Sequence, residues 1–512
     1  MRLRVTARTK LTAAFRILGL ALAVAAALVA PGAGSAQAAG GSSITSPDTA
    51  GIVGTYTSLA LDGSGNPVVA YHDLTTSDGD LKVLHCNDPD CAGGDESVVA
   101  ADTTGNVGSH TSLALDALGH PVVAYFDATN SDLKVLHCND PDCAGGDESI
   151  IAPDTAGLVG MFTSLALDGS GDPVVSYYDQ TNGDLKVLHC NDAACAGGDD
   201  SIATPDAAGD VGYQTSLALD VSGNPVVSYF DNANGDLTTG NLKLLHCDDP
   251  DCAAGGESVT SPATASYWGL RTSLALDASG NPVVAYADME GNLTILRCDD
   301  PNCAAGGESI TAPEPGGFDE WLPSLVVDAS GSPVVTYTDS FIDLKVLHCG
   351  DPSCLGANSV VTADAAGAVG EHSSLRLDSS GLAVVSYHDG WPNDDLKVLH
   401  CATPTCDPDF DGDGCPDVKE DQTSEGSETS GGRRNIKNPW DYFNPTGDGQ
   451  NRVDDILAIV QKYFVDFGNP NYTTGTDRTY EGPNPWNLGP PNGQIRVDDI
   501  LNNVKQYFHD CG

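Results

Sequence analysis

The chain has 512 residues, of which 72 are Asp or Glu and 23 are Lys or Arg, so its formal net charge is −49. Proteins hold nucleic acid and anionic membrane surfaces through Lys and Arg, and a chain this acidic excludes both as partners. With 58 glycines, 30 prolines, 40% hydrophobic and 19% charged residues, the composition is typical of a folded protein of short strands and turns, not of a disordered acidic tail.

Residues 1–38 have the pattern of a secretory signal peptide. Basic residues precede the apolar run 17–30, and Ala36-Gln37-Ala38 forms a small-residue cleavage signal. The apolar run has 14 residues, whereas a membrane-spanning helix needs about 20, which disfavours the alternative of a membrane anchor. We therefore expect a secreted, extracellular protein without membrane insertion.

Residues 39–406 contain seven copies of one repeat. The segment LKVLHC, or a close variant, ends successively at Cys86, Cys138, Cys190, Cys247, Cys298, Cys349 and Cys401. Each copy joins four strand-like segments of the types TSLALD, PVVAY, LKVLHC and ESIxAP, with a D-x-S-G-N-P turn between the first two. Four strands and a period of about 52 residues predict one propeller blade per copy, and so an all-β seven-bladed β-propeller.

The two ends of the repeat array complement each other. The seventh copy lacks its ESIxAP-type strand, and a spare one, SSITSPDTAG (42–51), precedes the first copy. We expect residues 42–46 to form the outermost strand of blade seven, which closes the ring and leaves no open edge. The alternative is an open solenoid, which would need distinct polar caps that the sequence does not show.

The repeat resembles known propeller families. The arrangement resembles a seven-bladed β-propeller with WD-repeat-style closure, and strings such as LALDGSGNPVVAYHD (59–73) are similar to those of sialidase-like and lectin-like propellers. A sialidase-like hydrolase would need an arginine cluster, an acid/base Asp and a Tyr–Glu pair. The repeats contain only Arg271, Arg297 and Arg376, so we expect no enzymatic activity. Because the YxD string recurs in every blade, we expect it to make a structural hydrogen bond.

The 16 cysteines fall into pairs. Seven have the C-x4-C spacing, namely Cys86/Cys91, Cys138/Cys143, Cys190/Cys195, Cys247/Cys252, Cys298/Cys303, Cys349/Cys354 and Cys401/Cys406, and Cys415 and Cys511 remain as an eighth pair. In an oxidising compartment this predicts a disulfide in each third-to-fourth strand loop. The alternative is a metal site using His85 and its counterparts, but each blade supplies too few ligands for zinc.

The loops divide into two kinds, which antiparallel strands place on opposite rims. The D-x-S-G-N-P turns and C-x4-C loops repeat almost unchanged and define the turn rim; the loops after YxD vary and define the variable rim. Just before the first strand of successive blades the variable rim carries Tyr56, His110, Phe162, Gln214, Arg271, Leu322 and His372, with Trp321 adjacent and Trp391 after a YxD strand. Aromatic and polar groups together predict a sugar or peptide site, although each position alone could have drifted without constraint.

Residues 407–421 contain a predicted calcium loop. In DFDGDGCPDVKE (409–420) the acidic residues fall at loop positions 1, 3, 5, 9 and 12, with Gly414 at position 6, which is the register of an EF-hand loop. The predicted ligands are Asp409, Asp411, Asp413, the Cys415 carbonyl, Asp417 and Glu420. The absence of an apparent entry helix resembles thrombospondin type-3 and dockerin loops, and a solvated acidic loop is the alternative.

A linker (422–435) leads to a duplicated loop-helix module (436–512). Its two copies, 438–464 and 484–508, each end in a helical apolar pattern. The duplication resembles dockerin, a module that binds cohesin domains, so the module implies a cohesin-like partner. The first loop offers a weaker second calcium site at Asn444, Thr446, Asp448 and Asp455, while Leu488 and Pro490 replace ligands in the second.

Taken together, these patterns predict a secreted calcium-binding propeller that recognises a glycan or an extracellular protein on its variable rim, with a dockerin-like docking tail. The alternative function is a dockerin-bearing carbohydrate-active hydrolase that acts on extracellular polysaccharide. That function would require two carboxylates at catalytic separation at one location.

Overall fold

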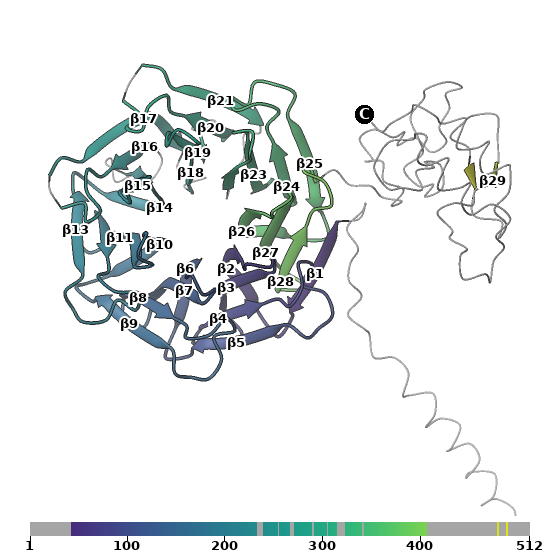
Figure 1. Cartoon of the computed structure of the whole chain (residues 1–512), viewed down its shortest axis with the longest axis horizontal. Helices are drawn as coiled ribbons and strands as arrows, with labels where there is room; N and C mark the ends of the chain where they lie inside the picture. The colour runs from purple at the N-terminus through teal and green to yellow at the C-terminus, as the bar shows by residue number, and fades with distance from the viewer. Residues whose placement is uncertain are drawn as a thin grey trace, which may run out of the picture. The chain divides into compact units, whose positions relative to one another are not determined.

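The computed structural model describes residues 42–232, 239–253, 255–266, 271–288, 291–304, 306–314, 323–339 and 342–406, with the short paired strands β29 (Thr479–Tyr480) and β30 (Leu488–Gly489). Seven four-stranded antiparallel sheets are arranged in a ring (Figure 1). The predicted seven-bladed propeller is therefore confirmed. The predicted signal peptide, calcium loop, linker and Cys415–Cys511 pair lie outside the described residues, as does the dockerin-like module apart from β29 and β30.

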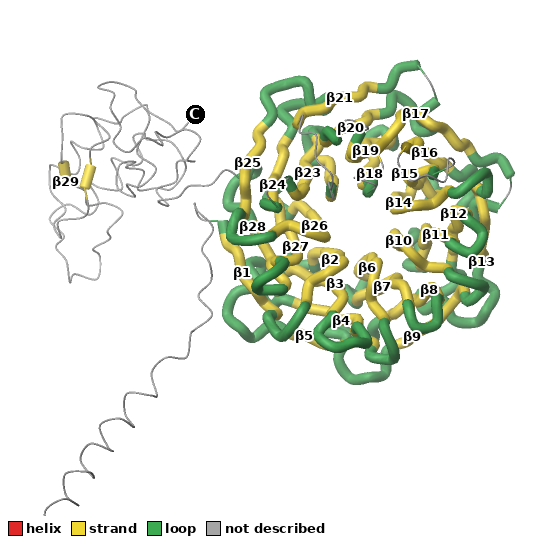
Figure 2. Tube along the Cα trace, turned by 180° about the vertical axis from the view of Figure 1, so that it is seen from behind, coloured by secondary structure: helices red, strands yellow, loops and turns green. Residues whose placement is uncertain are grey.

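Each blade runs outward from an innermost first strand (Figure 2). Blade one comprises β2 (Val53–Leu61), β3 (Pro67–Asp73), β4 (Asp80–His85) and β5 (Ser97–Asp102). Blades two to four comprise β6 (Val107–Leu115), β7 (Pro121–Asp127), β8 (Asp132–His137) and β9 (Ser149–Asp154); β10 (Val159–Leu167), β11 (Pro173–Asp179), β12 (Asp184–His189) and β13 (Ser201–Asp206); and β14 (Val211–Leu219), β15 (Pro225–Asp231), β16 (Thr239–His246) and β17 (Ser258–Ser266). Blades five and six comprise β18 (Ser273–Leu276), β19 (Pro282–Ala287), β20 (Leu293–Arg297) and β21 (Ser309–Glu314); and β22 (Ser324–Val327), β23 (Pro333–Thr338), β24 (Leu344–His348) and β25 (Ser359–Asp364).

Blade seven is closed by the first strand of the chain. It comprises β26 (Val369–Leu377), β27 (Ala383–Asp389), β28 (Asp395–His400) and β1 (Ser43–Asp48), with β1 antiparallel to β28. Ile44 lies opposite Leu399 and is buried. The predicted closure is thus confirmed, with a strand that continues two residues beyond the predicted range 42–46. Pairing covers the hydrogen-bonding edge that β28 would otherwise expose.

The hydrophobic core lies between neighbouring blades. At the boundary of blades one and two, Val68 and Val83 pack in one cluster with Val107, Leu113 and Tyr125. Because each sheet is covered on both faces by its neighbours, its middle strands are apolar on both faces, and every residue of β3, β7, β11 and β27 is buried.

A repeated hydrogen bond joins the innermost strands around the whole ring. In each blade the Leu of the TSL string donates its backbone N–H to the Ser hydroxyl of the preceding blade, as from Leu113 to Ser58 Oγ at 2.9 Å. The same bond occurs at the other six boundaries, at Leu165–Ser112, Leu217–Ser164, Leu274–Ser216, Leu325–Ser273, Leu375–Ser324 and Leu59–Ser374. The last of these spans the closure between blades seven and one.

The YxD string forms a second inter-blade contact. In blade three, Tyr177 Oη donates to Asp154 Oδ2 of blade two at 2.8 Å, and Lys186 Nζ lies 2.9 Å from Asp154 and 3.0 Å from Asp179 of the YxD string. Equivalent Tyr–Asp–Lys contacts occur at Tyr71/Asp48/Lys82, Tyr125/Asp102/Lys134, Tyr229/Asp206/Lys243 and Tyr387/Asp364/Lys397. The expected structural role of YxD is confirmed, because its carboxylate holds a lysine between two blades.

The turn rim carries the seven predicted disulfides. All seven C-x4-C pairs are bonded, each in the loop that follows the third strand of its blade, with Cα–Cα distances from 4.8 to 5.1 Å. The bridges are Cys86–Cys91, Cys138–Cys143, Cys190–Cys195, Cys247–Cys252, Cys298–Cys303, Cys349–Cys354 and Cys401–Cys406.

The two cysteines of each bridge differ in backbone conformation, which the C-x4-C spacing did not predict. Cys86 directly follows β4 and donates its backbone N–H to the Pro67 carbonyl at 2.9 Å. Cys91 instead has a left-handed φ of 48° and donates its N–H to the Asp88 carbonyl at 3.2 Å. The second cysteine of each predicted bridge therefore has a conformation that is unfavourable for an L-residue. The same left-handed conformation, with φ from 50° to 54°, occurs at Cys143, Cys195, Cys252, Cys303, Cys354 and Cys406.

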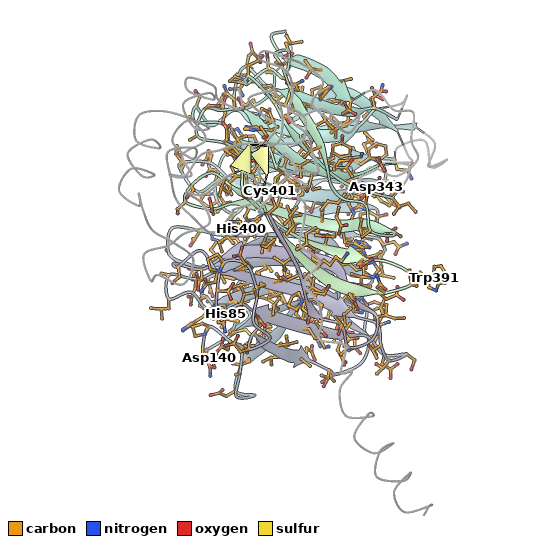
Figure 3. All side chains as sticks on the ribbon, turned by 90° about the vertical axis from the view of Figure 1, so that its right-hand side faces the viewer. His85, Asp140, Asp343, Trp391, His400 and Cys401 are labelled. Carbon is orange, nitrogen blue, oxygen red and sulfur yellow. A yellow bond between two sulfur atoms is a disulfide. The ribbon has the colours of Figure 1, made fainter. Side chains whose placement is uncertain are left out.

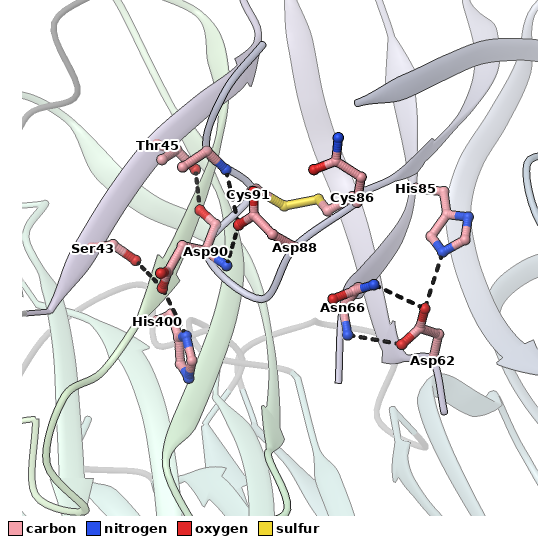
Figure 4. Close-up of a disulfide and its surroundings, with 12 residues drawn as sticks. Ser43, Thr45, Asp62, Asn66, His85, Cys86, Asp88, Asp90, Cys91 and His400 are labelled. Atoms are coloured by element: carbon pink, nitrogen blue, oxygen red, sulfur yellow. Dashed lines mark hydrogen bonds and ion pairs between the residues drawn. A yellow bond between two sulfur atoms is a disulfide. The ribbon is translucent and has the colours of Figure 1, made fainter. Parts of the chain in front are cut away.

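A histidine contact joins neighbouring blades on the same rim. His85 lies 3.3 Å from Asp62 of its own blade through Nε2 and 2.8 Å from Asp142 of the next blade through Nδ1. Figure 4 shows the corresponding contact from His400 to Asp90 across the ring closure, beside the Cys86–Cys91 bridge. Both ring nitrogens of His85 serve a structural contact and the cysteines are oxidised, so the alternative of a Cys–His metal site is wrong.

The turn aspartate that contacts the histidine of its own blade has a lowered pKa. Burial alone would raise the pKa of Asp62, but hydrogen bonds from the backbone of Asn66 and Ser64 and from His85 lower it below its ordinary value. The same balance lowers the pKa of Asp116, Asp168, Asp220, Asp328 and Asp378, the equivalent turn residues of other blades. These carboxylates therefore stabilise the fold above their unfolded pKa, near 3.8, and lose that contribution as the pH falls.

We predict that β1 contributes to stability as an ordinary outer strand does. Asp48→Asn removes a carboxylate from Tyr71 and Lys82, and Asp102→Asn removes the equivalent one from Tyr125 and Lys134 inside the continuous array. Each should lower the free energy of unfolding by about 1–3 kcal/mol, the usual contribution of a hydrogen bond to a charged group. Urea unfolding would measure both; an effect of Asp102→Asn alone would show that β1 does not hold the ring closed.

We predict a modest effect for any one disulfide. Cys190→Ser combined with Cys195→Ser opens a loop whose cysteines are five residues apart, which the chain-entropy model values at about 2 kcal/mol. Thermal unfolding of the double variant should remain a single transition at a lower midpoint. Separation into two transitions would instead show that the bridge determines the folding of the whole blade.

Candidate functional site

Five of the predicted rim residues occupy one equivalent position in the innermost strands. These residues are Tyr56, His110, Phe162, Gln214 and His372, and their φ angles lie between 51° and 56°. The prediction that they precede the first strand is wrong for these blades, because they lie inside β2, β6, β10, β14 and β26 at irregularities of the pairing register. Arg271 has the equivalent position just before β18.

A threonine from the next blade supports this unusual backbone. A positive φ costs an L-residue roughly 1–2 kcal/mol, so it persists only where surrounding contacts fix it. Thr215 Oγ1 donates to the Phe162 carbonyl at 2.7 Å, and Thr57 Oγ1 donates to the His372 carbonyl at 2.6 Å. Thr111, Thr163 and Thr272 donate in the same way to Tyr56, His110 and Gln214.

Together these residues enclose a central pocket of about 130 Å³. Its walls are Tyr56, Thr57, His110, Thr111, Phe162, Thr163, Gln214, Thr215, Arg271, Thr272, Pro323, Ser324 and Ser373. Of the predicted rim residues, the pocket is therefore lined by Tyr56, His110, Phe162, Gln214 and Arg271. His372 contacts Tyr56 and Arg271. The pocket lies toward the variable rim. The first strand of each blade runs from the variable rim to the turn rim, and the lining residues such as Tyr56 lie in the half of that strand nearer its start.

Trp391, one of the two predicted tryptophans, does not line this pocket. Trp391 lies in the loop between β27 and β28, and its side chain is 81% exposed. Figure 3 shows Trp391 and Asp343 at one edge of the ring, with His85, Asp140, His400 and Cys401 at the opposite edge, as expected for two distinct rims. Trp321 and Leu322 lie outside the described residues.

Aromatic rings form a continuous arc on one side of the pocket. The Tyr56 ring lies 4.4 Å from His372 and 4.6 Å from His110, and His110 lies 4.6 Å from Phe162, measured between ring centroids. Behind Phe162, Tyr178 and Tyr213 stack at 4.4 Å. Blades seven, one, two and three therefore present ring faces and edges, whereas blades four and five present the polar side chains of Gln214 and Arg271.

Arg271 reaches across the pocket. Its Nη2 lies 2.8 Å from His372 Nδ1, and its guanidinium carbon lies 5.8 Å from the centroid of Tyr56. Because arginine only donates, His372 Nδ1 accepts this hydrogen bond and the imidazole is neutral. Burial, followed by the nearby charge of Arg271, holds the pKa of His372 well below its usual value. The same two causes lower the pKa of His110 to about 3.

No carboxylate is among the described residues that line the pocket. Glu371, which lies beside His372 in the chain, approaches His388 Nδ1 at 3.7 Å, and this contact lowers the pKa of Glu371. The described lining therefore does not supply the two carboxylates of a glycosidase. Of the three arginines considered for a sialidase-like site, only Arg271 lines the pocket; Arg297 pairs with Asp277 at 2.7 Å, and Arg376 donates to the Leu375 carbonyl.

Sequence reasoning missed the threonines, Ser373 and the second row of rings. The available signal was the Thr of TSLALD, which follows the variable position directly in five of the seven blades, at Thr57, Thr111, Thr163, Thr215 and Thr272. A residue type held constant beside a variable one would have indicated a backbone support for the variable side chain.

In the described part of the chain, one group of acidic residues has a spacing that could hold a metal ion. Asp248, Asp249 and Glu257 place carboxylate oxygens within 4.8 Å of one another on the disulfide loop of blade four. Three oxygens are fewer than the six to eight that calcium takes in proteins. All predicted calcium ligands, Asp409 to Glu420 and Asn444 to Asp455, lie outside the described residues.

Comparison with known proteins finds similarity at the level of structure only. No family model matches the chain, and no curated protein matches its sequence. Similar solved structures include the BP39L lectin from Burkholderia pseudomallei, with 10% identity over 67% of this chain and 94% of that one and a TM-score of 0.44. The SapL1 lectin in complex with alpha methyl fucoside has 12% identity over 61% and 97%, TM-score 0.38, and the polysaccharide lyase Uly1 has 9% over 68% and 90%, TM-score 0.42.

In the part of the chain that the structure describes, no helix has the length and apolar character to cross a membrane.

We predict that the neutral histidines of the pocket make stability depend on pH. The folded-state pKa of His110 is about 3, whereas the unfolded value is near 6.5. As the pH falls below about 6.5, the unfolded chain takes up a proton that the folded chain refuses, so the free energy of unfolding decreases. His110→Gln should reduce this slope by up to about 1.4 kcal/mol per pH unit. Urea unfolding between pH 7.5 and pH 4.5 measures it, and equal slopes for both proteins would contradict the assignment.

Proposed function

We propose that this protein is a secreted saccharide-binding propeller whose central pocket, and not the loop tips of the variable rim, is the recognition site. The observation that carries the proposal is one pocket lined by the aromatic arc of Tyr56, His110 and Phe162 and by the polar Gln214 and Arg271. His372 extends the arc through its contact with Tyr56. Aromatic rings offer flat apolar faces to the C–H groups of a sugar ring, and the polar side chains fix its hydroxyl groups. The volume of about 130 Å³ is of the order of a cavity that admits one six-membered ring.

The fixed backbone and the uncharged histidines of the pocket favour ligand binding without catalysis. Its backbone is held by a threonine at five positions, and the lowered pKa values of His110 and His372 keep both imidazoles uncharged near neutral pH. A preorganised pocket of donors and acceptors binds a sugar at low entropic cost. The seven disulfides are typical of an extracytoplasmic compartment, which supports the proposal that residues 1–38 direct export.

The proposal extends to the C-terminal residues as a separate unit of function. We assign calcium to Asp409, Asp411, Asp413, Cys415, Asp417 and Glu420, and docking or attachment to residues 436–512, both from the sequence pattern. Saccharide binding by the pocket should therefore be independent of calcium.

Binding of the full mature chain to a glycan array, followed by titration calorimetry of the ligand found, tests this function. Tyr56→Ala and Phe162→Ala should each weaken binding about tenfold, because each removes a stacking face from the pocket. Leu118→Ala is the control, since Leu118 is 75% exposed on the turn rim.

Two further arms locate the site. A chelator should leave binding unchanged, and Trp391→Ala should have little effect because Trp391 lies outside the pocket lining. If Trp391→Ala abolishes binding while Tyr56→Ala does not, the site is on the loop tips and the proposed pocket is wrong. Absence of binding to every glycan would reject the function itself.

A further inference from the structure

Arg271 differs from almost every other cation of the ring. All six lysines of the described propeller, Lys82, Lys134, Lys186, Lys243, Lys345 and Lys397, lie within 4 Å of at least one carboxylate. Arg297 likewise pairs with Asp277. Among the described residues, Arg271 has no carboxylate at that distance.

The Arg271 guanidinium also has few hydrogen-bond acceptors among the described side chains. It carries five N–H groups, and its contact among the described side chains is the neutral His372 Nδ1 at 2.8 Å. Burial lowers the pKa of Arg271, which means that the site disfavours its charge. The charge of Glu371 acts on Arg271 and partly opposes this effect, but no described carboxylate lies within 4 Å of the guanidinium. A charge held partly away from water without a directly paired counter-ion is costly, and that cost is relieved by an anion that enters the pocket.

We propose that the saccharide bound in the central pocket carries a carboxylate, as a uronic acid residue does, and that Arg271 binds this carboxylate through its remaining N–H groups. The inference rests on the proposed function and specifies its ligand class. Guanidinium and carboxylate match as two parallel hydrogen bonds, which fixes both the position and the orientation of the sugar.

The rest of the pocket fits an acidic sugar. No described lining residue bears a negative charge that would repel a carboxylate. The ring of Tyr56 lies beside Arg271, so a sugar whose carboxylate meets the guanidinium would lie against the aromatic arc. Gln214, from the blade before Arg271, adds a donor and an acceptor for hydroxyl groups.

The net charge of the chain opposes this ligand at long range but not in contact. The acidic surface repels an anion during approach, yet at about 0.15 M salt charges further apart than about 8 Å are largely screened. A direct Arg–carboxylate contact in a partly buried pocket is screened much less. We therefore expect a lower association rate with uronates, and retained affinity.

The test uses matched ligands on the full mature chain. Galacturonate, glucuronate and mannuronate oligosaccharides are compared with their carboxyl-reduced neutral counterparts and with sulfated neutral oligosaccharides of equal length. Loss of the carboxylate should weaken binding of at least one uronate about tenfold to a hundredfold, the usual range for a charged hydrogen-bonded pair.

Two variants assign the effect to Arg271. Arg271→Gln should weaken uronate binding by the same factor as carboxyl reduction and should leave binding of the reduced ligand unchanged. Arg271→Lys keeps the charge without the planar fork and should recover part of the loss. Arg376→Gln is the matched control, since Arg376 lacks a carboxylate partner among the described residues but does not line the pocket. The melting temperature of each variant establishes that it is folded.

The outcomes separate this inference from the proposed function. Equal binding of a uronate and its reduced counterpart overturns the inference and leaves saccharide recognition intact. Preference for sulfated ligands that depends on Arg271 overturns the carboxylate assignment. If no saccharide of either kind binds the chain, both the inference and the proposed function are wrong.

Discussion

The propeller depends on one hydrogen bond repeated between innermost strands, from the N–H of a Leu to the Ser hydroxyl of the preceding blade. The backbone hydrogen bonds of each sheet stop at the edges of its own blade, and the packing between sheets tolerates sliding more readily than hydrogen bonds do. The Ser58–Leu113 bond and its six equivalents fix the height of each blade relative to the next. Further from the ring axis, Lys186 joins its blade to the preceding one through Asp154. On the turn rim, His85 joins its blade to the next one through Asp142.

This framework explains how a regular repeat can build an irregular site. Tyr56 lies two residues before Ser58, and its carbonyl accepts from Thr111 of the next blade. The backbone at the pocket is therefore fixed by the Thr that bonds to the Tyr56 carbonyl and by the Ser58–Leu113 bond two residues later. Both kinds of bond recur in most blades. The side chain between them is free to differ, and in this chain it is aromatic, imidazole, amide or guanidinium according to the blade.

Much of the fold could be predicted from the sequence because each blade repeats the same evidence seven times. The phase of the repeat, with a spare strand at 42–51 and a missing one after Cys406, was enough to predict the closure that Ile44 and Leu399 make. The rim residues Tyr56, His110, Phe162, Gln214, Arg271 and His372 could be predicted as a set from their variation. Their position inside a strand could not, because a positive φ at Tyr56 reflects support from Thr111 on another blade. The contact of Arg271 with His372, 101 residues apart, depends on ring geometry that no local pattern encodes.

The closing strand has a consequence for the order of assembly. β1 is the first strand of the propeller to be synthesised, and its contact with the last blade, from Ala402 to Ser42, spans 360 residues. Contacts this distant in sequence are entropically the slowest to form. Each disulfide, by contrast, joins cysteines five residues apart, so its partner is already present when its own blade emerges. Oxidation of the loops can therefore be complete, blade by blade, while the ring is still an open arc.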